Sequence, residues 1–368
     1  MSEDKPVPHA ASIESSCSDE GAGWSRAAPL TRCSLQGISL VRCREMARQR
    51  HAAGRYDAST LACYRQALRL GKSATDLVAY LSFRRDMGVA LHVRHAPYVR
   101  RAMSVLGPRA WLEAFGLLAE ITDQVPPLPF YFRPFIARLR AFSPPLAAGC
   151  ASTADAFGRG MSTLVQEQDA QRADFIRFLA EQTNLCVVGN AGQLNGSGLG
   201  TRIDAHDCVI RFNQYASLHS DPKDRGIKTD VWVRAPGFVP QQLDYTGKWG
   251  VVTGPDLRYR LTDWRLFLPL LDRGVPMLTV PLPIWRSLVQ ALFAPPSAGL
   301  LFLAWLRTLR PSGLQGVSLV GFQRGSVLSG GAYHHAVPKQ PPGHRHNWRH
   351  ERALLSEWMS RDKGDWLN

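Results

Sequence analysis

A loop rich in glycine follows an apolar run near the middle of the chain and could hold a ligand. Residues 185–200 read LCVVGNAGQLNGSGLG and include five glycines. Glycines let backbone N–H groups approach a phosphate or a sugar closely, and the side chain of Asn190 can both donate and accept hydrogen bonds. The loop contains no GxGxxG motif directly after the apolar run, and it lacks the lysine of a P-loop. These residues therefore disfavour a dinucleotide site and a P-loop, and they leave a plain turn as an alternative.

The elements that would position this loop form an α/β pattern in the C-terminal half. Six short apolar runs suit buried strands: LCVVGN, CVIRFN, TDVWVRA, WGVVTG, PMLTV and VSLVGF. Helical patterns such as PSAGLLFLAWLRTL lie between some of them, and such alternation predicts a Rossmann-like, largely parallel sheet with flanking helices. Ligands in such sheets bind at the carboxyl ends of the strands. The expected fold class is thus α/β, preceded by an all-α N-terminal region.

The N-terminal half predicts helices. Leu61, Tyr64 and Leu68 have the spacing of one helical face, Gly71 is a candidate helix end, and Ser73 is a candidate N-cap. The pattern resembles one helix pair of the tetratricopeptide type, but a single unit makes an accessory helical domain the better interpretation. We expect a disordered tail over 1–30, a helical domain over 31–150 that ends in a linker rich in proline and aromatic residues, and a second domain over 151–368.

The composition limits the class of protein and its partners. Of 368 residues, 45% are hydrophobic and 20% are charged, as in globular proteins, and the net charge of +14 predicts anionic partners. No RNA-recognition signature is present, so nucleic acid is not expected. The seven cysteines contain no CxxC pair, which argues against disulfides and zinc and favours a reducing compartment. With no apolar run of transmembrane length and no signal peptide, we expect a cytoplasmic protein.

A series of short motifs follows in order from the glycine loop onward. They are Gly189-Asn190-Ala191-Gly192, Gly198-Leu199-Gly200, Ile203-Asp204-Ala205-His206-Asp207, Arg211-Phe212-Asn213 and Gly226-Ile227-Lys228-Thr229. This order resembles the large sialylmotif of the family 29 sialyltransferases. Later segments, PPSAGLLFLAWLRTL with GVSLVGFQ, then GAYHHAV, then HNWRHE, resemble the small, third and last motifs. The resemblance covers about residues 183–360 and implies a GT-A-like sialyltransferase fold.

The resemblance also implies the substrates and the residues that bind them. The donor would be a CMP-activated 2-keto-3-deoxy sugar acid, either sialic acid or a relative such as Kdo, and the acceptor a saccharide or glycolipid hydroxyl. Asn190, Asn213 and the backbone around Gly192 would bind the donor. Ser297 and Gly299, which we expect to precede a helix, would hold the cytidine or the carboxylate of the sugar.

The expected catalytic residues are histidines. His346 is the expected general base, because an acceptor hydroxyl loses its proton as it attacks and imidazole titrates near neutral pH. Glu351 would orient that histidine or cap the local structure, and His344 and His350 are nearby competitors. His335, with His334 as the alternative, would contact the donor phosphate as it leaves.

The sequence departs from the family pattern in three places. Ala336 replaces the aromatic residue that normally follows the third-motif histidine. The segment 296–322 contains no cysteine that could pair with one in the large motif, and we expect the membrane anchor of the animal enzymes to be missing. We therefore expect Cys186 to be reduced and the protein to be a bacterial-type, cytoplasmic relative. Peripheral contact with the inner face of an anionic membrane is a further possibility that the sequence leaves open.

The expected activity is inverting glycosyl transfer in surface polysaccharide or lipid-linked glycan synthesis. No Asp-x-Asp metal motif lies in the domain, so no metal and no cofactor is expected. Two alternatives stay open: the same fold acting on another donor, and a degenerate nucleotide-binding module whose N-terminal helices bind a partner without transferase activity.

Overall fold

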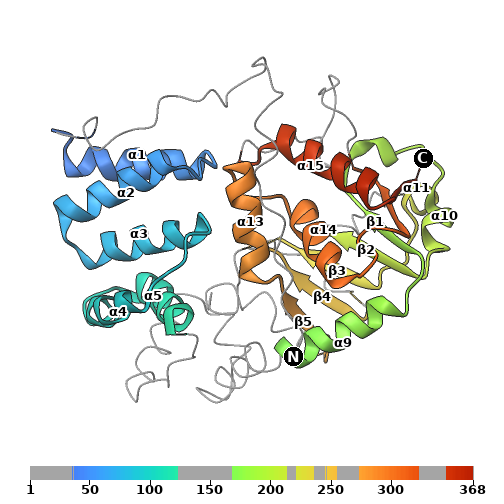
Figure 1. Ribbon diagram of the computed structural model, residues 1–368, viewed down its shortest axis with the longest axis horizontal. Helices are drawn as coiled ribbons and strands as arrows, with labels where there is room; N and C mark the ends of the chain where they lie inside the picture. The colour runs from blue at the N-terminus through green and yellow to red at the C-terminus, as the bar shows by residue number, and fades with distance from the viewer. Residues whose placement is uncertain are drawn as a thin grey trace.

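The computed structural model describes residues 35, 37–122, 168–213, 221–235, 245, 247–254, 273–322 and 345–367. Two parts lie side by side, a helical N-terminal part and an α/β part that contains the sheet (Figure 1). The predicted tail over 1–30, the proline-rich linker and the boundary at residue 150 lie outside the described residues. Among the described helices, none combines the length and the apolar character needed to span a bilayer.

In the described residues of the N-terminal part there are five α-helices and one 3-10 helix. They are α1 (Leu40–Ala52), α2 (Ala58–Gly71), α3 (Ala74–Asp86), η2 (Val93–His95), α4 (Ala96–Met103) and α5 (Pro108–Thr122). The side chains of Ser39, Asp57 and Ser73 cap the first three α-helices by accepting a backbone N–H from the first turn. The cap at Ser73 and the end of α2 at Gly71 are those expected from the sequence.

The most deeply buried apolar residues of α2 are small. Leu61, Tyr64 and Leu68 are only partly buried, whereas Cys63 and Ala67 are fully covered. Small side chains allow close approach to α1, and Cys63 lies in one apolar cluster with Ala47 of α1. Close packing of small residues therefore decides the orientation of this helix, and the larger apolar side chains lie at its margins.

The α/β part contains a sheet of seven parallel strands. The strands are β1 (Leu185–Val188), β2 (Cys208–Phe212), β3 (Val231–Arg234), β4 (Trp249–Val252), β5 (Met277–Thr279), β6 (Val317–Val320) and β7 (Asp365–Trp366). Their order is β5-β4-β3-β2-β1-β6-β7, and every neighbouring pair is parallel. The six predicted strands and the α/β class are confirmed, whereas the two-residue β7 was not foreseen.

The strand order reverses direction between β1 and β6. From β1 the chain continues to β2, β3, β4 and β5 on one side, and β6 then returns to the other side of β1. A reversal of this kind opens a crevice beyond the carboxyl ends of the two strands, where ligands bind in open α/β sheets. The glycine loop begins at this point, since Gly189 directly follows β1.

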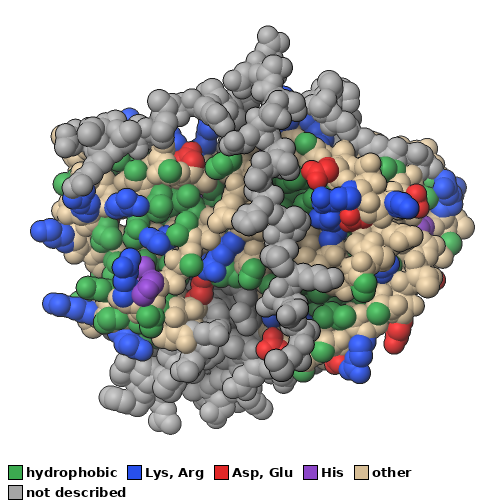
Figure 2. Space-filling view, viewed as in Figure 1, with side chains coloured by type: hydrophobic (Ala, Val, Ile, Leu, Met, Phe, Trp, Pro, Cys, Tyr) green, Lys and Arg blue, Asp and Glu red, His purple; other side chains and the backbone are tan. Residues whose placement is uncertain are grey.

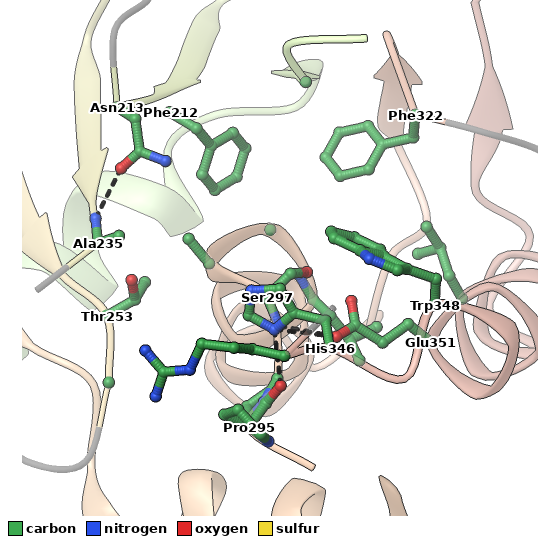
Figure 3. Close-up of a pocket in the computed structure, with 18 of the residues that line it drawn as sticks. Phe212, Asn213, Ala235, Thr253, Pro295, Ser297, Phe322, His346, Trp348 and Glu351 are labelled. Atoms are coloured by element: carbon green, nitrogen blue, oxygen red, sulfur yellow. Dashed lines mark hydrogen bonds and ion pairs between the residues drawn. The ribbon is translucent and has the colours of Figure 1, made fainter. Parts of the chain in front are cut away.

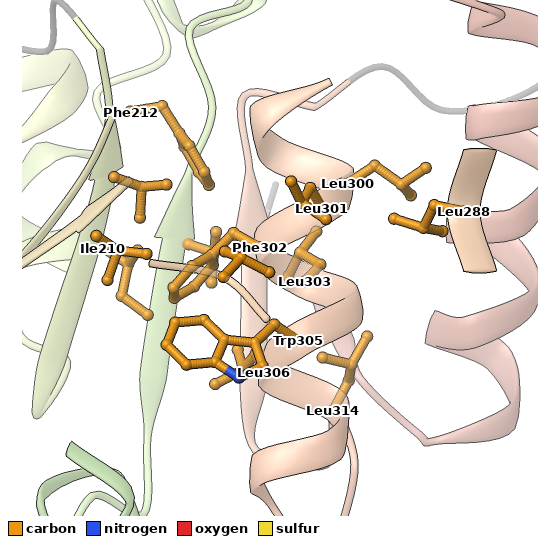
Figure 4. Close-up of a cluster of buried hydrophobic side chains, with 14 of the residues drawn as sticks. Ile210, Phe212, Leu288, Leu300, Leu301, Phe302, Leu303, Trp305, Leu306 and Leu314 are labelled. Carbon is orange, nitrogen blue, oxygen red and sulfur yellow. The ribbon is translucent and has the colours of Figure 1, made fainter. Parts of the chain in front are cut away.

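Helices cover the sheet. They are α9 (Gln168–Ala180), α10 (Gly200–Asp204), α11 (Pro222–Arg225), α13 (Leu282–Leu292), α14 (Ala298–Leu309) and α15 (Trp348–Arg361), with a 3-10 turn, η3, at Gly192–Leu194. Helix α14 is mainly apolar. It packs on β2 through Phe302 and faces α13 through Leu300 (Figure 4). This packing fixes the N-terminal end of α14 beside the carboxyl ends of the strands.

Candidate active site

One cavity of about 620 Å³ lies at the carboxyl ends of the strands. Its lining comes from the ends of β1, β2, β3, β4 and β6, from the start of α14, from the start of α15, and from the N-terminal helices. The predicted residues Asn190, Asn213, Ser297, Gly299, His346 and Glu351 all line it. Figure 3 shows most of these side chains around one space. Residues more than 150 positions apart in the sequence are thus brought together.

The two strand-end asparagines present complementary groups. The Nδ2 of Asn190 donates to the carbonyl oxygen of Phe212 at 3.0 Å, which leaves its Oδ1 as a hydrogen-bond acceptor. The Oδ1 of Asn213 accepts from the N–H of Ala235 at 2.7 Å, which leaves its NH₂ group as a donor (Figure 3). Asn213 also has a φ of 46°, a left-handed conformation that asparagine tolerates. Fixed in this way, the two amides offer one acceptor and one donor to a ligand.

The glycine loop itself is occupied by a carboxylate of this protein. The N–H groups of Gly196 and Gly198 donate to Asp224 at 2.6 and 2.8 Å, and these bonds hold the pKa of Asp224 below its usual value. Gly192, at the start of η3, is not among the residues that line the cavity. Gly189 is required for close packing, because a Cβ there would lie 2.3 Å from the carbonyl oxygen of Gly321. Most glycines of this loop therefore shape the chain without facing the cavity.

The other charged residues of the motif also hold the loop together. The carboxylate of Asp204 accepts the N–H groups of Ile227 and Lys228 at 2.9 to 3.0 Å. The guanidinium of Arg211 donates to the carbonyl oxygens of Lys228 and Arg225 at 2.8 and 2.7 Å. These bonds tie β2 to the segment before β3, so this part of the motif positions the strand that ends in Asn213.

The N-terminal end of α14 faces the cavity. Ser297 is the N-cap, and its Oγ accepts the N–H of Leu300 at 3.3 Å. Gly299, expected before the helix, is instead its second residue, where a Cβ would lie 2.9 Å from the ring of Phe322. The N–H groups of Ala298 and Gly299 belong to the first turn and have no intrahelical acceptor. The end of this helix is therefore suited to a negatively charged ligand.

The ring of His346 is held by a backbone carbonyl. Its Nδ1 lies 2.8 Å from the oxygen of Pro295, and since a carbonyl can only accept, Nδ1 carries a proton (Figure 3). Burial lowers the pKa of His346, and the positive charge of Arg345 acts in the same direction, while the bond to Pro295 opposes them. The imidazole is therefore neutral at pH 7, and its Nε2 has a free lone pair. The side chain remains 27% exposed.

Glu351 stabilises the start of α14. Its Oε1 accepts the N–H of Ser297 at 2.8 Å and lies 3.8 Å from Nδ1 of His346, beyond hydrogen-bond distance. The residue is 4% exposed, and burial raises the pKa of its carboxyl to about 7. Glu351 thus links the first turn of α15 to the N-cap of α14, and the carbonyl of Pro295 orients the histidine.

The cavity also includes residues that sequence analysis did not identify. His51, Tyr56 and Asp86 reach it from the N-terminal helices, and Pro295 contributes its carbonyl. No local pattern marks them, because their proximity arises only from the docking of one part of the chain on the other. His334 and His335 lie outside the described residues. In the described ranges, no group of three or more His, Cys, Asp or Glu side chains could hold a metal ion.

Comparison with protein families gives one match to a defined segment. The model of glycosyltransferase family 29 (sialyltransferase) matches residues 137–259. This range contains the glycine loop, Asn190 and Asn213, and it ends before Ser297 and His346.

Curated proteins match short segments. Sialyltransferase-like protein 2 of Oryza sativa subsp. indica is 46% identical over 59 residues, 16% of this chain and 15% of that protein. Alpha-N-acetylgalactosaminide alpha-2,6-sialyltransferase 2 of Mus musculus is 37% identical over 105 residues, 26% of each chain. The alignments thus span about a quarter or less of these relatives.

Among solved structures, the crystal structure of a mammalian sialyltransferase aligns with 59% of this chain and 79% of its own. The sequence identity is 20%, and the TM-score is 0.39. The family model and the curated relatives agree that the segment 137–259, which carries the glycine loop and both strand-end asparagines, is similar to glycosyltransferase family 29, the sialyltransferases.

Proposed function

We propose that this protein transfers a 2-keto-3-deoxy sugar acid, sialic acid or a relative such as Kdo, from a CMP-activated donor to a saccharide hydroxyl. The family match and the curated relatives support the donor class. The observation that carries the proposal is the position of His346. A neutral imidazole with its Nδ1 proton fixed by Pro295 lies in the same cavity as the two family-motif asparagines.

The reaction is a direct displacement at the anomeric carbon. The Nε2 of His346 takes the proton of the acceptor hydroxyl as its oxygen forms a bond to that carbon. The bond from the carbon to the phosphate oxygen breaks, and CMP leaves with the electron pair. Attack opposite the leaving group inverts the configuration. His335, or His334 in its place, would assist the departing phosphate.

The donor sugar lies on the sheet side of the cavity. Asn190 offers an acceptor, Asn213 offers a donor, and the first turn of α14 beyond Ser297 offers N–H groups to the phosphate or the carboxylate. The leaving phosphate already carries negative charge, so the transfer needs no metal ion. Activity that is lost in EDTA and restored by manganese would contradict this part of the proposal.

We place the reaction in a reducing, cytoplasmic setting, in the synthesis of surface polysaccharide or lipid-linked glycan by a bacterial-type relative. Four buried cysteines are free. Cys186 and Cys208 belong to separate apolar clusters of the sheet, so they pack in different surroundings.

Peripheral contact with an anionic membrane is part of the same proposal. Val93, Tyr98 and Val105 are 64%, 63% and 75% exposed, and the arginines of α4, Arg100 and Arg101, lie between them in the sequence. Lys and Arg side chains are spread over both parts of the molecule in Figure 2, with apolar side chains between them. Mixed apolar and basic surfaces of this kind suit the boundary of an anionic bilayer.

The decisive experiment follows the release of CMP. The protein is incubated with CMP-sialic acid and with CMP-Kdo, with and without a saccharide mixture, and CMP is quantified by mass spectrometry. Release that depends on His346 supports the proposal and selects the donor. Binding of CMP without release from either donor, alone or with saccharide, would instead favour a nucleotide-binding protein without transferase activity.

A further inference from the structure

The N-terminal helices form one wall of the cavity that contains the strand-end asparagines. His51 at the end of α1, Tyr56 in the turn before α2 and Asp86 at the end of α3 line the same space as Asn190 and His346. In Figure 1 these helices lie on the opposite side of α13 from the sheet. The wall they form therefore stands across the cavity from the strand ends that would hold the donor sugar.

This wall is fixed to the α/β part by close contacts. A Cβ on Gly54 would lie 2.2 Å from the carbonyl oxygen of Arg345, so the α1–α2 turn touches the backbone next to His346. The N–H of Tyr56 donates to the carbonyl oxygen of Phe293 at 3.2 Å, and the indole N–H of Trp285 donates to that of Asp86 at 3.0 Å. Hydrogen bonds at both ends of the wall therefore fix its position relative to His346, the candidate base.

The side chains of the wall form one hydrogen-bonded chain that ends beside His346. The hydroxyls of Tyr64 and Tyr56 lie 3.0 and 3.2 Å from the two ring nitrogens of His51. The guanidinium of Arg345 donates to the hydroxyl of Tyr56 at 3.4 Å. A phenol, an imidazole and a guanidinium are thus linked in one chain, and its last member, Arg345, directly precedes His346 in the sequence.

Asp86 gives the wall an acceptor for hydroxyl groups. Its Oδ1 receives two bonds from Arg85 at 3.1 and 3.2 Å, whereas its Oδ2 lies 3.9 Å from Nε2 of His51. The side chains of His51 and Asp86 are 26% and 10% exposed, so both can be reached from the cavity. A carboxylate oxygen accepts hydroxyl hydrogens and repels a second carboxylate.

We propose that His51, Tyr56 and Asp86 form the acceptor subsite, and that it takes a neutral sugar through its hydroxyl groups. The inference rests on the proposed transferase function and deepens it. The family motifs supply the site for the donor sugar, and the N-terminal helices, which lie outside the matched segment, select the acceptor. The charge of Asp86 disfavours an acidic sugar.

The test separates acceptor binding from donor binding. With CMP at saturation, the full chain is titrated with methyl β-galactoside and methyl α-N-acetylgalactosaminide as neutral probes and with methyl β-galacturonide as an acidic probe. Saturation-transfer NMR measures the dissociation constants. We expect at least one neutral glycoside to bind more tightly than the galacturonide, because only the acidic probe meets charge repulsion.

Two matched pairs of variants locate the subsite. Asp86→Asn is compared with Glu113→Gln, because both carboxylates bind Arg85 but only Asp86 lines the cavity. Tyr56→Phe is compared with Tyr80→Phe, which removes a hydroxyl elsewhere in the helical part. The first member of each pair should weaken binding of the neutral glycoside about fivefold or more, as expected for a lost hydrogen bond, and its control should not.

The outcomes distinguish the two proposals. If CMP itself does not bind the wild-type chain, the proposed function fails. If CMP binds but no neutral glycoside does, if the galacturonide binds more tightly, or if Tyr56→Phe and Asp86→Asn match their controls, the acceptor subsite lies elsewhere. Should Asp86→Asn prove unstable, the pair of tyrosine variants decides alone.

Discussion

The Nδ1 atom of His346 lies 2.8 Å from the carbonyl oxygen of Pro295, two residues before the N-cap of α14. One short segment therefore fixes both the tautomer of the histidine and the start of the helix that faces the same cavity. Glu351 closes the arrangement by accepting the N–H of Ser297. The candidate base and the candidate anion site are thus parts of one structure, and they can be perturbed separately.

Replacing His346 with Gln should lower the transfer rate by about 10²-fold to 10⁴-fold, because the acceptor hydroxyl loses its base. Binding of CMP, measured by calorimetry, should change little. His350→Gln is the control, since His350 is exposed in the first turn of α15 and does not line the cavity. Equal rates for His346→Gln and the wild type would remove His346 from the mechanism.

At acidic pH, kcat/KM should fall with a midpoint below the ordinary pKa of a histidine side chain. The base must be neutral to accept a proton, and burial lowers the pKa of His346 below 6.5. The rate should therefore rise with pH through that lowered pKa and be level near pH 7. Initial rates from pH 4.5 to 8 provide the check, and the limb should be absent from the residual activity of His346→Gln. A midpoint above 6.5 would contradict a neutral, buried imidazole.

Glu351→Gln should stabilise the protein more at pH 8 than at pH 5. Burial raises the pKa of Glu351 from 4.5 to about 7, so the folded state holds an extra proton between these values. The contribution of Glu351 to the free energy of unfolding is complete below pH 4.5, and it is lost as the pH rises through about 7, the pKa of Glu351 in the folded state. The stabilisation of the protein by Glu351→Gln should therefore be larger at pH 8 than at pH 5 by at most about 3 kcal/mol. Urea unfolding at both pH values measures it, with Glu357→Gln on the same helix as control.

Asn213→Asp should weaken CMP binding while the strand end stays folded. Aspartate retains the Oδ1 that accepts the N–H of Ala235 and tolerates the φ of 46°. It replaces the free NH₂ group by a charged oxygen that repels the phosphate. We expect the dissociation constant of CMP to rise about tenfold or more by calorimetry. A comparable loss in thermal stability would indicate instead that Asn213 mainly supports the strand.

Gly189→Ala should destabilise the protein, whereas Gly192→Ala should not. A methyl group at 189 would lie 2.3 Å from the carbonyl oxygen of Gly321, whereas nothing lies within 4 Å of one at 192. Overpacking at the first site should cost about 1 to 3 kcal/mol. The second change should leave the melting temperature close to that of the wild type. Similar melting temperatures for the two variants would mean that β1 and β6 separate easily.

Sequence reasoning identified those parts of the site that depend on local pattern. Buried strands have a distinctive composition, and the carboxyl ends of parallel strands meet at one edge, so Asn190 and Asn213 could be placed together before the structure was known. The six strands were predicted for the same reason. The helix after Ser297 was likewise found, although Gly299 proved to lie inside it.

The remaining features depend on contacts that no local pattern records. A backbone carbonyl such as that of Pro295 has no side-chain signature. His51 and Asp86 reach the cavity only because the N-terminal helices dock on α13 and on the segment at Arg345. The spacing of the larger apolar residues of α2 likewise does not show that the smaller Cys63 is the one packed in a cluster with Ala47 of α1.

The two hydrogen bonds that the glycine loop donates to Asp224 have a practical consequence for crystallisation and assay. The N–H groups of Gly196 and Gly198, which in a P-loop would be open to a phosphate, already bind a carboxylate of the same chain. Its lowered pKa keeps that carboxylate ionised in mildly acidic buffers. Sulfate or phosphate at high concentration therefore has to displace an intramolecular anion to enter this loop. Inhibition by these salts would report competition at the cavity, where the first turn of α14 is open.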